Sequence, residues 1–287
     1  MENKAKPFLK WAGGKSQLIE TIYENLPTDF NNIDTYIEPF IGGGAILFSM
    51  IEKFPHIKNF IINDINKDLT NVYKCIKLHP DVLIYNLSSL VDKYKSLNSL
   101  VEKENYYYEI RELYNCDKPN DFLSAAYFIF LNKTCFNGLY RVNRLNKFNV
   151  PFGKKLNPTI FDKENIYACS TALQNVTILT GDYRLVTSYI TNKSFVYLDP
   201  PYKPVSNTSN FNAYSSSIFD DNEQIELLHV CEKISSKNAL FMASNSNHSM
   251  FDTLYSQYNI KRIDAKRSIN SKGNLRGNVK EILITNY

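Results

Sequence analysis

The feature that most constrains the fold is a double proline placed directly after a short apolar run. Residues 194–198 read Ser-Phe-Val-Tyr-Leu, which has strand length and is rich in residues that favour strands. Pro200 and Pro201 cannot donate to a ladder and fix φ, so the strand must end there. Asp199 and Tyr202 therefore flank a stiff turn at the carboxyl end of a strand. In open α/β sheets, ligands bind at that edge.

This turn suits chemistry on an amino group attached to a flat ring. Asp199 and the Pro200 carbonyl are hydrogen-bond acceptors with little freedom to move, and Tyr202 can stack on a ring. Asp199, Pro200 and Tyr202 are therefore the predicted catalytic residues. The same tetrapeptide also fits an ordinary proline-rich turn with an exposed acid, and taken alone it does not separate the two interpretations.

A second strand, turn and helix are expected near the amino terminus. Residues 34–38 predict a strand that ends near Glu38, and an apolar helix is expected from Ala45 onward. The intervening glycines, residues 42–44, let the backbone turn tightly and approach a ligand closely. Residues 59–64 predict the next strand, which ends in Asp64. In a doubly wound sheet an acid at this position binds ribose hydroxyls.

The acid before the glycines indicates which cofactor fits. Glu38 would repel a pyrophosphate, and the G-x-G-x-x-G fingerprint of nicotinamide sites is missing. A cofactor with positive centres, such as the sulfonium and ammonium of S-adenosylmethionine, fits better. Residues 13–16 end like a P-loop, but Leu9 occupies the position where that motif requires glycine. Nearby Trp11 fits either a lid over an adenine ring or a packed amino-terminal arm.

Composition excludes several classes of protein. The chain has 287 residues, of which 44% are hydrophobic and 22% charged, as in soluble proteins of one or two domains. It lacks an apolar run long enough for a membrane span and a signal-peptide pattern. The five cysteines and four histidines show no metal-ligand spacing, so we expect no metal, a reducing cytoplasmic environment and cysteines that serve as small core residues.

Positive charge is concentrated in two segments. The net charge is only +4, yet residues 141–155 carry five basic residues and no acid, and residues 261–280 carry seven basic residues and one acid. Such clustering predicts a surface for a polyanion. The alternative is two solvated charged faces.

The segment between the second strand and the first basic cluster is expected to be helical. Residues 67–132 show apolar positions three and four apart and no strand signal. They lead into Asn137-Gly138, a turn dipeptide that favours positive φ at both positions and would project Arg141 and Asn143 beside a groove. We therefore predict a catalytic domain of residues 1–66 and 166–287, and an inserted, mainly helical domain of residues 67–165.

Taken together, the motifs resemble the Dam family of DNA adenine-N6 methyltransferases. Four segments occur in the order of that family: Phe-Leu-Lys-Trp-Ala-Gly-Gly-Lys at 8–15, Glu-Pro-Phe-Ile-Gly-Gly-Gly at 38–44, Asn-Asp-Ile-Asn at 63–66 and Asp-Pro-Pro-Tyr at 199–202. The likeness extends through residues 131–141, 148–153 and 266–271, and so covers nearly the whole chain.

The resemblance implies an α/β, Rossmann-like S-adenosylmethionine-dependent fold whose inserted domain recognises DNA. It implies site-specific methyl transfer to N6 of a flipped adenine in duplex DNA, within GATC because residues 136–141 carry the aromatic-Asn-Gly-Leu-x-Arg pattern. Together with the motifs above it marks these cofactor-binding candidates: Trp11, Lys15, Glu38, Phe40, Gly42, Asp64, Asp182 and Asp199. With the basic segments it marks these DNA-binding candidates: Phe136, Asn137, Leu139, Arg141, Lys147, Asn149, Lys272 and Arg276.

Other functions remain open from sequence. Methylation of cytosine N4, of RNA adenine or of a glutamine amide needs the same acceptor geometry, although those sites more often have Ser or Asn at the position of Asp199. A catalytically inactive DNA-binding relative and a nicotinamide oxidoreductase are the alternatives from other classes. We expect a monomer that acts on double-stranded DNA, without membrane or metal, in the cytoplasm of a bacterium or of a phage host. Pairing with a restriction endonuclease, regulatory marking and a phage role all stay open.

Overall fold

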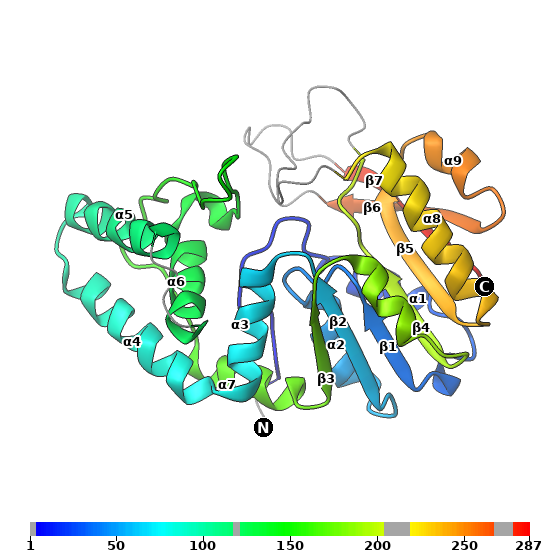
Figure 1. Cartoon of the computed structure of the whole chain (residues 1–287), viewed down its shortest axis with the longest axis horizontal. Coiled ribbons are helices and arrows are strands. Elements are labelled where there is room, and N and C mark those ends of the chain that lie inside the picture. The colour runs from blue at the N-terminus through cyan, green and yellow to red at the C-terminus, as the bar shows by residue number, and fades with distance from the viewer. Residues whose placement is uncertain (1–3, 117–120, 204–218, 267–277) are drawn as a thin grey trace.

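The structure is a computed structural model that describes residues 4–116, 121–203, 219–266 and 278–287 (Figure 1). Its centre is a seven-stranded sheet with the order β3-β2-β1-β4-β5-β7-β6. Strands β1 to β5 are parallel, whereas β7 runs antiparallel to both β5 and β6. The strands are β1 Thr35–Glu38, β2 Asn59–Asp64, β3 Val176–Thr180, β4 Ser194–Leu198, β5 Leu240–Ser246, β6 Asn259–Lys266 and β7 Asn278–Thr285. The predicted α/β class is confirmed.

Helices pack around this sheet and form a further part of the chain beside it. They are α1 Ile19–Glu24, α2 Ala45–Lys53, α3 Lys67–Leu78, α4 Pro80–Ser96, α5 Leu100–Cys116, α6 Asp121–Thr134, α7 Lys163–Leu173, α8 Asp221–Ser236 and α9 Met250–Leu254. The described residues also form the short 3-10 segments η1 Phe30–Asn32, η2 Phe136–Gly138 and η3 Tyr183–Ser188. The strands predicted at 34–38, 59–64 and 194–198 and the helix predicted from residue 45 are all present, because proline, asparagine or glycine marks a boundary of each.

Strand order reverses between β1 and β4. From β1 the chain moves outward to β2 and β3, then crosses back so that β4 pairs with the other side of β1. Open sheets leave a crevice at the carboxyl ends of the strands at such a point. Glu38 ends β1 and Asp199 follows β4, so the two acidic motifs of the sequence meet at this crevice.

The predicted helical segment forms α3 to α6. Figure 1 shows α4, α5 and α6 standing to one side of the sheet, whereas α3 lies between them and the strands. Helix α3 contacts β2 and β3 as well as α4, α6 and α7. The division at residues 66/67 and 165/166 stays a prediction, because α3 and α7 pack with both parts.

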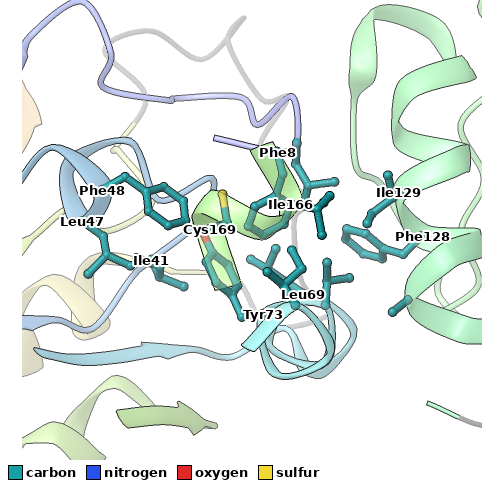
Figure 2. Packing of buried hydrophobic residues seen from close by; sticks show 14 of the residues in the cluster. Phe8, Ile41, Leu47, Phe48, Leu69, Tyr73, Phe128, Ile129, Ile166 and Cys169 are labelled. Atoms are coloured by element: carbon teal, nitrogen blue, oxygen red, sulfur yellow. The ribbon is translucent and has the colours of Figure 1, made fainter. Parts of the chain in front are cut away.

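Two hydrophobic cores follow the alternation of side chains along the strands. Tyr36 and Phe195 point into a core that continues through α2, α3 and α7 into the helical part. Figure 2 shows part of it, where Phe8 of the amino-terminal segment meets Tyr73 of α3, with ring centres 4.9 Å apart. Ile37 points to the opposite face, into the core covered by α8, α9 and η3.

The cysteines are mostly core residues, as predicted. Cys75, Cys135, Cys169 and Cys231 are buried, but Cys116 is exposed because it ends α5 on the solvent side. Within the described ranges no helix is long and apolar enough to cross a membrane, and no group of three or more His, Cys, Asp or Glu side chains could hold a metal ion.

Candidate active site

The crevice between β1 and β4 contains a buried ion pair. Asp199 Oδ1 lies 2.9 Å from Nζ of Lys15, which comes from the amino-terminal segment and is only 7% exposed. The same ammonium donates to the Gly13 carbonyl at 3.0 Å and lies 4.5 Å from the ring centre of Tyr202. The structure therefore brings three predicted site residues from distant segments into contact.

Two opposing influences act on the Asp199 carboxyl. Burial raises its pKa above the ordinary value, and the negative charge of Glu281 acts in the same direction. The charge and hydrogen bond of Lys15 lower the pKa. Lys15 is thus the cation that keeps Asp199 available as a hydrogen-bond acceptor.

The loop after Asp199 is held by polar side chains from α8 and β5. Gln224 Nε2 donates to the Pro201 carbonyl at 3.4 Å, and Ser246 Oγ donates to the Lys203 carbonyl at 2.7 Å. No donor among the described residues reaches the Pro200 carbonyl. That carbonyl therefore has its acceptor capacity available beside Asp199.

Tyr202 is fixed from the last strand of the sheet. Its hydroxyl donates to Glu281 Oε2 at 2.7 Å, and Glu281 lies on β7. Sequence reasoning missed Gln224, Ser246 and Glu281. No local motif marks them, since each becomes a neighbour of the loop only through the sheet order.

The glycine loop after β1 is tied to the end of β2. Gly42 and Gly44 have φ of 47° and 73°, a conformation that favours glycine. Asp64 Oδ2 accepts from the Gly42 amide at 3.1 Å, and Oδ1 accepts from the Asn66 amide at 2.9 Å. Burial raises the pKa of Asp64 to about 6, although these hydrogen bonds act against it. Asp64 thus stands at the ligand edge beside the loop, as its strand-end position predicts.

Trp11 packs between this loop and the helical part. A Cβ atom at Gly42 would lie 2.8 Å from Cδ1 of the indole. The ring also stacks on Tyr140, with centres 5.6 Å apart and planes at 24°, and on Phe128 at 6.3 Å. Of the two interpretations of Trp11, this geometry matches the packed arm, and a role over an adenine ring stays a prediction.

Glu38 is engaged inside the protein. It is 2% exposed and accepts the Tyr36 hydroxyl at 3.0 Å. Burial raises its pKa well above the usual range, and hydrogen bonds from Tyr36 and from the Leu47 amide lower it. Leu47 belongs to the first turn of α2, whose N-cap Gly44 supplies no side chain. Glu38 therefore also caps α2.

The end of β3 forms the neighbouring wall. Phe40 stacks on Tyr183, with ring centres 5.1 Å apart and planes at 29°. Asp182 is half exposed and pairs with Arg184, accepting from Nε and Nη2 at 2.7 Å each. The pKa of Asp182 is lowered, chiefly by the hydrogen bond from Arg184. Its carboxylate is thus already engaged with a cation.

This set of groups fits S-adenosylmethionine. The crevice is lined or flanked by four acidic side chains, Glu38, Asp64, Asp199 and Glu281. The charge of Asp199 raises the pKa of Glu38, and the charge of Glu281 raises the pKa of Asp199. Lys15 is the cation among them. An acidic crevice favours a sulfonium and an ammonium group over a pyrophosphate.

The predicted DNA-reading segment forms a hairpin. Asn137 and Gly138 have φ of 54° and 67°, so the predicted turn conformation is confirmed. The hairpin itself reverses at residues 143–146, and Arg141, which follows the Asn137-Gly138 turn, is exposed. Base reading by Arg141 stays a prediction. Asn143 closes the hairpin because its Oδ1 accepts from the amides of Leu145 and Lys147 at 2.9 and 3.0 Å.

Arg141 and Asn149 face each other across this hairpin. Arg141 Nε donates to Asn149 Oδ1 at 2.7 Å, and Nη2 donates to the Asn149 carbonyl at 3.2 Å. Arg141 and Lys147 are exposed and Phe136 is 48% exposed, whereas Leu139 is partly buried. Two further DNA-binding candidates, Lys272 and Arg276, lie outside the described residues.

Comparisons with known proteins agree on one family. Residues 11–269 match the family model described as D12 class N6 adenine-specific DNA methyltransferase. The chain is 48% identical to the type II methyltransferase M.MjaIII of Methanocaldococcus jannaschii, over 99% of this chain and 100% of that protein. It is 37% identical to M1.LlaDCHI of Lactococcus lactis subsp. cremoris, also a type II methyltransferase, and 31% identical to the DNA adenine methylase of Escherichia coli K12. Both matches cover 98% of this chain and 95% of the relative.

Proposed function

The chain belongs to the D12 class N6 adenine-specific DNA methyltransferases, and we propose that it moves the methyl group of S-adenosylmethionine to N6 of an adenine flipped out of a GATC site in duplex DNA. One observation carries the proposal. Asp199, which pairs with Lys15, lies next to a Pro200 carbonyl that no described donor reaches, at the point where the strand order reverses. These are two fixed acceptors for one amino group.

The acceptors act on the lone pair of the amine. Adenine N6 is a weak nucleophile because its lone pair is delocalised into the ring. Asp199 and the Pro200 carbonyl accept its two N–H groups, which localises the lone pair on nitrogen and aims it outward. Catalysis is then mainly positioning and electrostatics. Tyr202 stacks on the extruded base, which cannot be reached inside the duplex.

The cofactor would be held at the ends of β1, β2 and β4. S-adenosylmethionine, when bound, supplies a methyl group on a positively charged sulfur. Asp64 accepts backbone hydrogen bonds from Gly42, Ile65 and Asn66, and a carboxylate has about four lone-pair sites. It can therefore accept ribose hydroxyls without releasing the Gly42 loop. Glu38 and Asp199 give the crevice acceptor oxygens that suit an ammonium group. Trp11, Lys15, Phe40 and Asp182 are neighbouring candidates.

The GATC site is inferred from residues 136–141 and from the relatives named DNA adenine methylase. The exposed guanidinium of Arg141 matches a guanine edge in the major groove. Phe136, Asn137, Leu139, Asn149 and Lys147 are proposed to contact the same DNA. The names of the type II relatives support pairing with a restriction endonuclease. We propose a monomer acting in the cytoplasm, where DNA and methyl donor are both present.

The test is methyl transfer from tritiated S-adenosylmethionine to duplexes that differ only in the presence of GATC. We expect label on the GATC duplex alone, and N6-methyladenine after digestion and mass spectrometry. Asp199→Ala should remove transfer while the fold is retained. Label as N4-methylcytosine, label on RNA only, or an active Asp199→Ala variant would refute the proposal. Equal labelling of both duplexes would refute the GATC assignment.

A further inference from the structure

Glu281 lies at the ligand edge of the sheet although it comes from the last strand. Because β7 runs antiparallel to β5, Glu281 pairs with Ser246 at the carboxyl end of β5. From there Oε2 of Glu281 accepts the hydroxyl of Tyr202 at 2.7 Å, across 79 positions of sequence. The contact joins the carboxyl-terminal strand to the catalytic loop.

Two charged groups hold the Tyr202 side chain at different points. Nζ of Lys15 lies 4.5 Å from the ring centre, and the carboxylate of Glu281 binds the hydroxyl. A hydrogen bond to an ionised acceptor is shorter and stronger than a neutral one. A tyrosine ring turns about two side-chain bonds, so contacts at its face and at its tip together restrict both rotations.

The backbone of the loop would not by itself fix the ring. Gln224 and Ser246 hold the carbonyls of Pro201 and Lys203, on either side of Tyr202. These bonds fix where the Tyr202 side chain begins, whereas contacts of the ring and hydroxyl, among them those with Lys15 and Glu281, set the plane of the ring. A stacking platform must have that plane set before the base arrives, because reorientation costs rate at each turnover.

We propose that Glu281 is a positioning residue for methyl transfer, which holds the Tyr202 hydroxyl so that the ring is oriented to stack on the flipped adenine. The proposal rests on the proposed function, since it takes Tyr202 as the platform for the target base. Glu281 acts through Tyr202 and does not touch the reacting atoms.

A double-mutant cycle tests the proposal with Glu281→Ala, Tyr202→Phe and the two combined. Each single variant removes the hydrogen bond between Glu281 and the Tyr202 hydroxyl, so each should lower kcat about 10- to 100-fold with little change in KM for DNA. The combined variant should be no slower than the slower single variant. Glu281→Gln should recover most of the rate, because its amide oxygen still accepts the hydroxyl.

A spectroscopic measurement separates orientation from general damage. With 2-aminopurine at the target position, stacking on the Tyr202 ring quenches fluorescence, so both single variants should fluoresce more strongly in complex than the wild type. Glu232→Ala, which removes an exposed glutamate of α8 outside the crevice and the basic segments, is the matched control and should behave as wild type.

Several outcomes would overturn the role of Glu281. They are additive losses in the combined variant, a Glu281→Gln enzyme as slow as Glu281→Ala, or fluorescence equal to wild type in both single variants. A wild-type protein that does not methylate adenine N6 would refute the proposed function instead, so the two failures are distinguishable.

Discussion

Lys15→Met should lower the free energy of unfolding more at neutral pH than in acid. The substitution keeps the length of the side chain and removes the ammonium that lies 2.9 Å from Asp199 Oδ1. Both side chains are largely buried, with exposed fractions of 8% and 18%. The variant therefore leaves a buried carboxylate without its cation.

The expected loss is large for one side chain. Breaking a buried ion pair by removing one partner costs about 3–5 kcal/mol of the free energy of unfolding. Lys4→Met is the matched control, because Lys4 pairs with Glu52 on the surface, with exposed fractions of 69% and 48%. Exposed pairs of this kind contribute about 0–1 kcal/mol.

The pH dependence follows from the pKa of Asp199, which burial already raises in the wild type. The folded state then keeps a proton that the unfolded chain has lost, so stability falls as pH rises between the unfolded and folded pKa values. Without Lys15 the folded pKa of Asp199 rises further, and the fall continues to higher pH. In acid, Asp199 is protonated in every state of both proteins, so the difference between them shrinks.

Urea unfolding from acid to weakly alkaline pH measures this difference, and the pH profile of kcat provides a second readout. Because the amine requires an ionised acceptor, the acid limb of the Lys15→Met profile should move to higher pH. A stability loss that is the same at every pH, or as small as that of Lys4→Met, would show that Lys15 does not act through the charge of Asp199.

Three further predictions concern the ligands. Asp64→Ala should weaken binding of S-adenosylhomocysteine by about 1.5–3 kcal/mol in calorimetry. Asp182→Ala should have less effect, because Arg184 already binds that carboxylate. Equal affinities of wild type and Asp64→Ala would show that Asp64 does not bind the cofactor. The binding constant for DNA should fall as salt concentration rises, with a slope on logarithmic axes of about −0.9 per phosphate contact. The proposed phosphate contacts are Lys147, Lys154, Lys155, Lys272 and Arg276. A binding constant that does not change with salt would indicate that the two basic segments are solvated charged faces. Arg141→Ala should reduce the ratio of methylation rates between GATC and sites altered at the guanine more than it weakens binding, and an unchanged ratio would exclude base reading by Arg141.

Short sequence patterns predicted those strands and helices whose ends are set by neighbouring residues. β1, β2 and β4 were predictable because apolar runs end at glycine, asparagine or proline, and α3 to α6 because apolar positions recur every three or four residues. Asn137 and Gly138 have the predicted positive φ, but the hairpin reverses further along the chain, at residues 143–146. The actual reversal depends on the Asn143 side chain, which accepts two backbone amides.

In the candidate site, too, contacts between residues adjacent in sequence could be predicted, whereas contacts between distant segments could not. Asp199, Pro200 and Tyr202 are adjacent in sequence, so their joint chemistry was visible there. The pairing of Lys15 with Asp199 was not, although the two motifs were each identified. It depends on the return of the chain from β3 to β4, which places two distant segments at one crevice. The hydrogen bond of Arg141 with Asn149 likewise required the register of the hairpin.

The direction of β7 explains why a residue so far along the chain reaches the catalytic loop. Ligand-facing residues of a parallel strand come from its carboxyl end, where β1 and β4 supply Glu38 and Asp199. An antiparallel strand at the same edge presents residues from its first half instead, and Glu281 is the fourth residue of β7, opposite Ser246. Had β7 been parallel, the carboxylate would lie toward the opposite edge of the sheet, out of reach of the Tyr202 hydroxyl. The antiparallel strand therefore adds Glu281 to the acidic side chains that Glu38, Asp64 and Asp199 already place at the crevice.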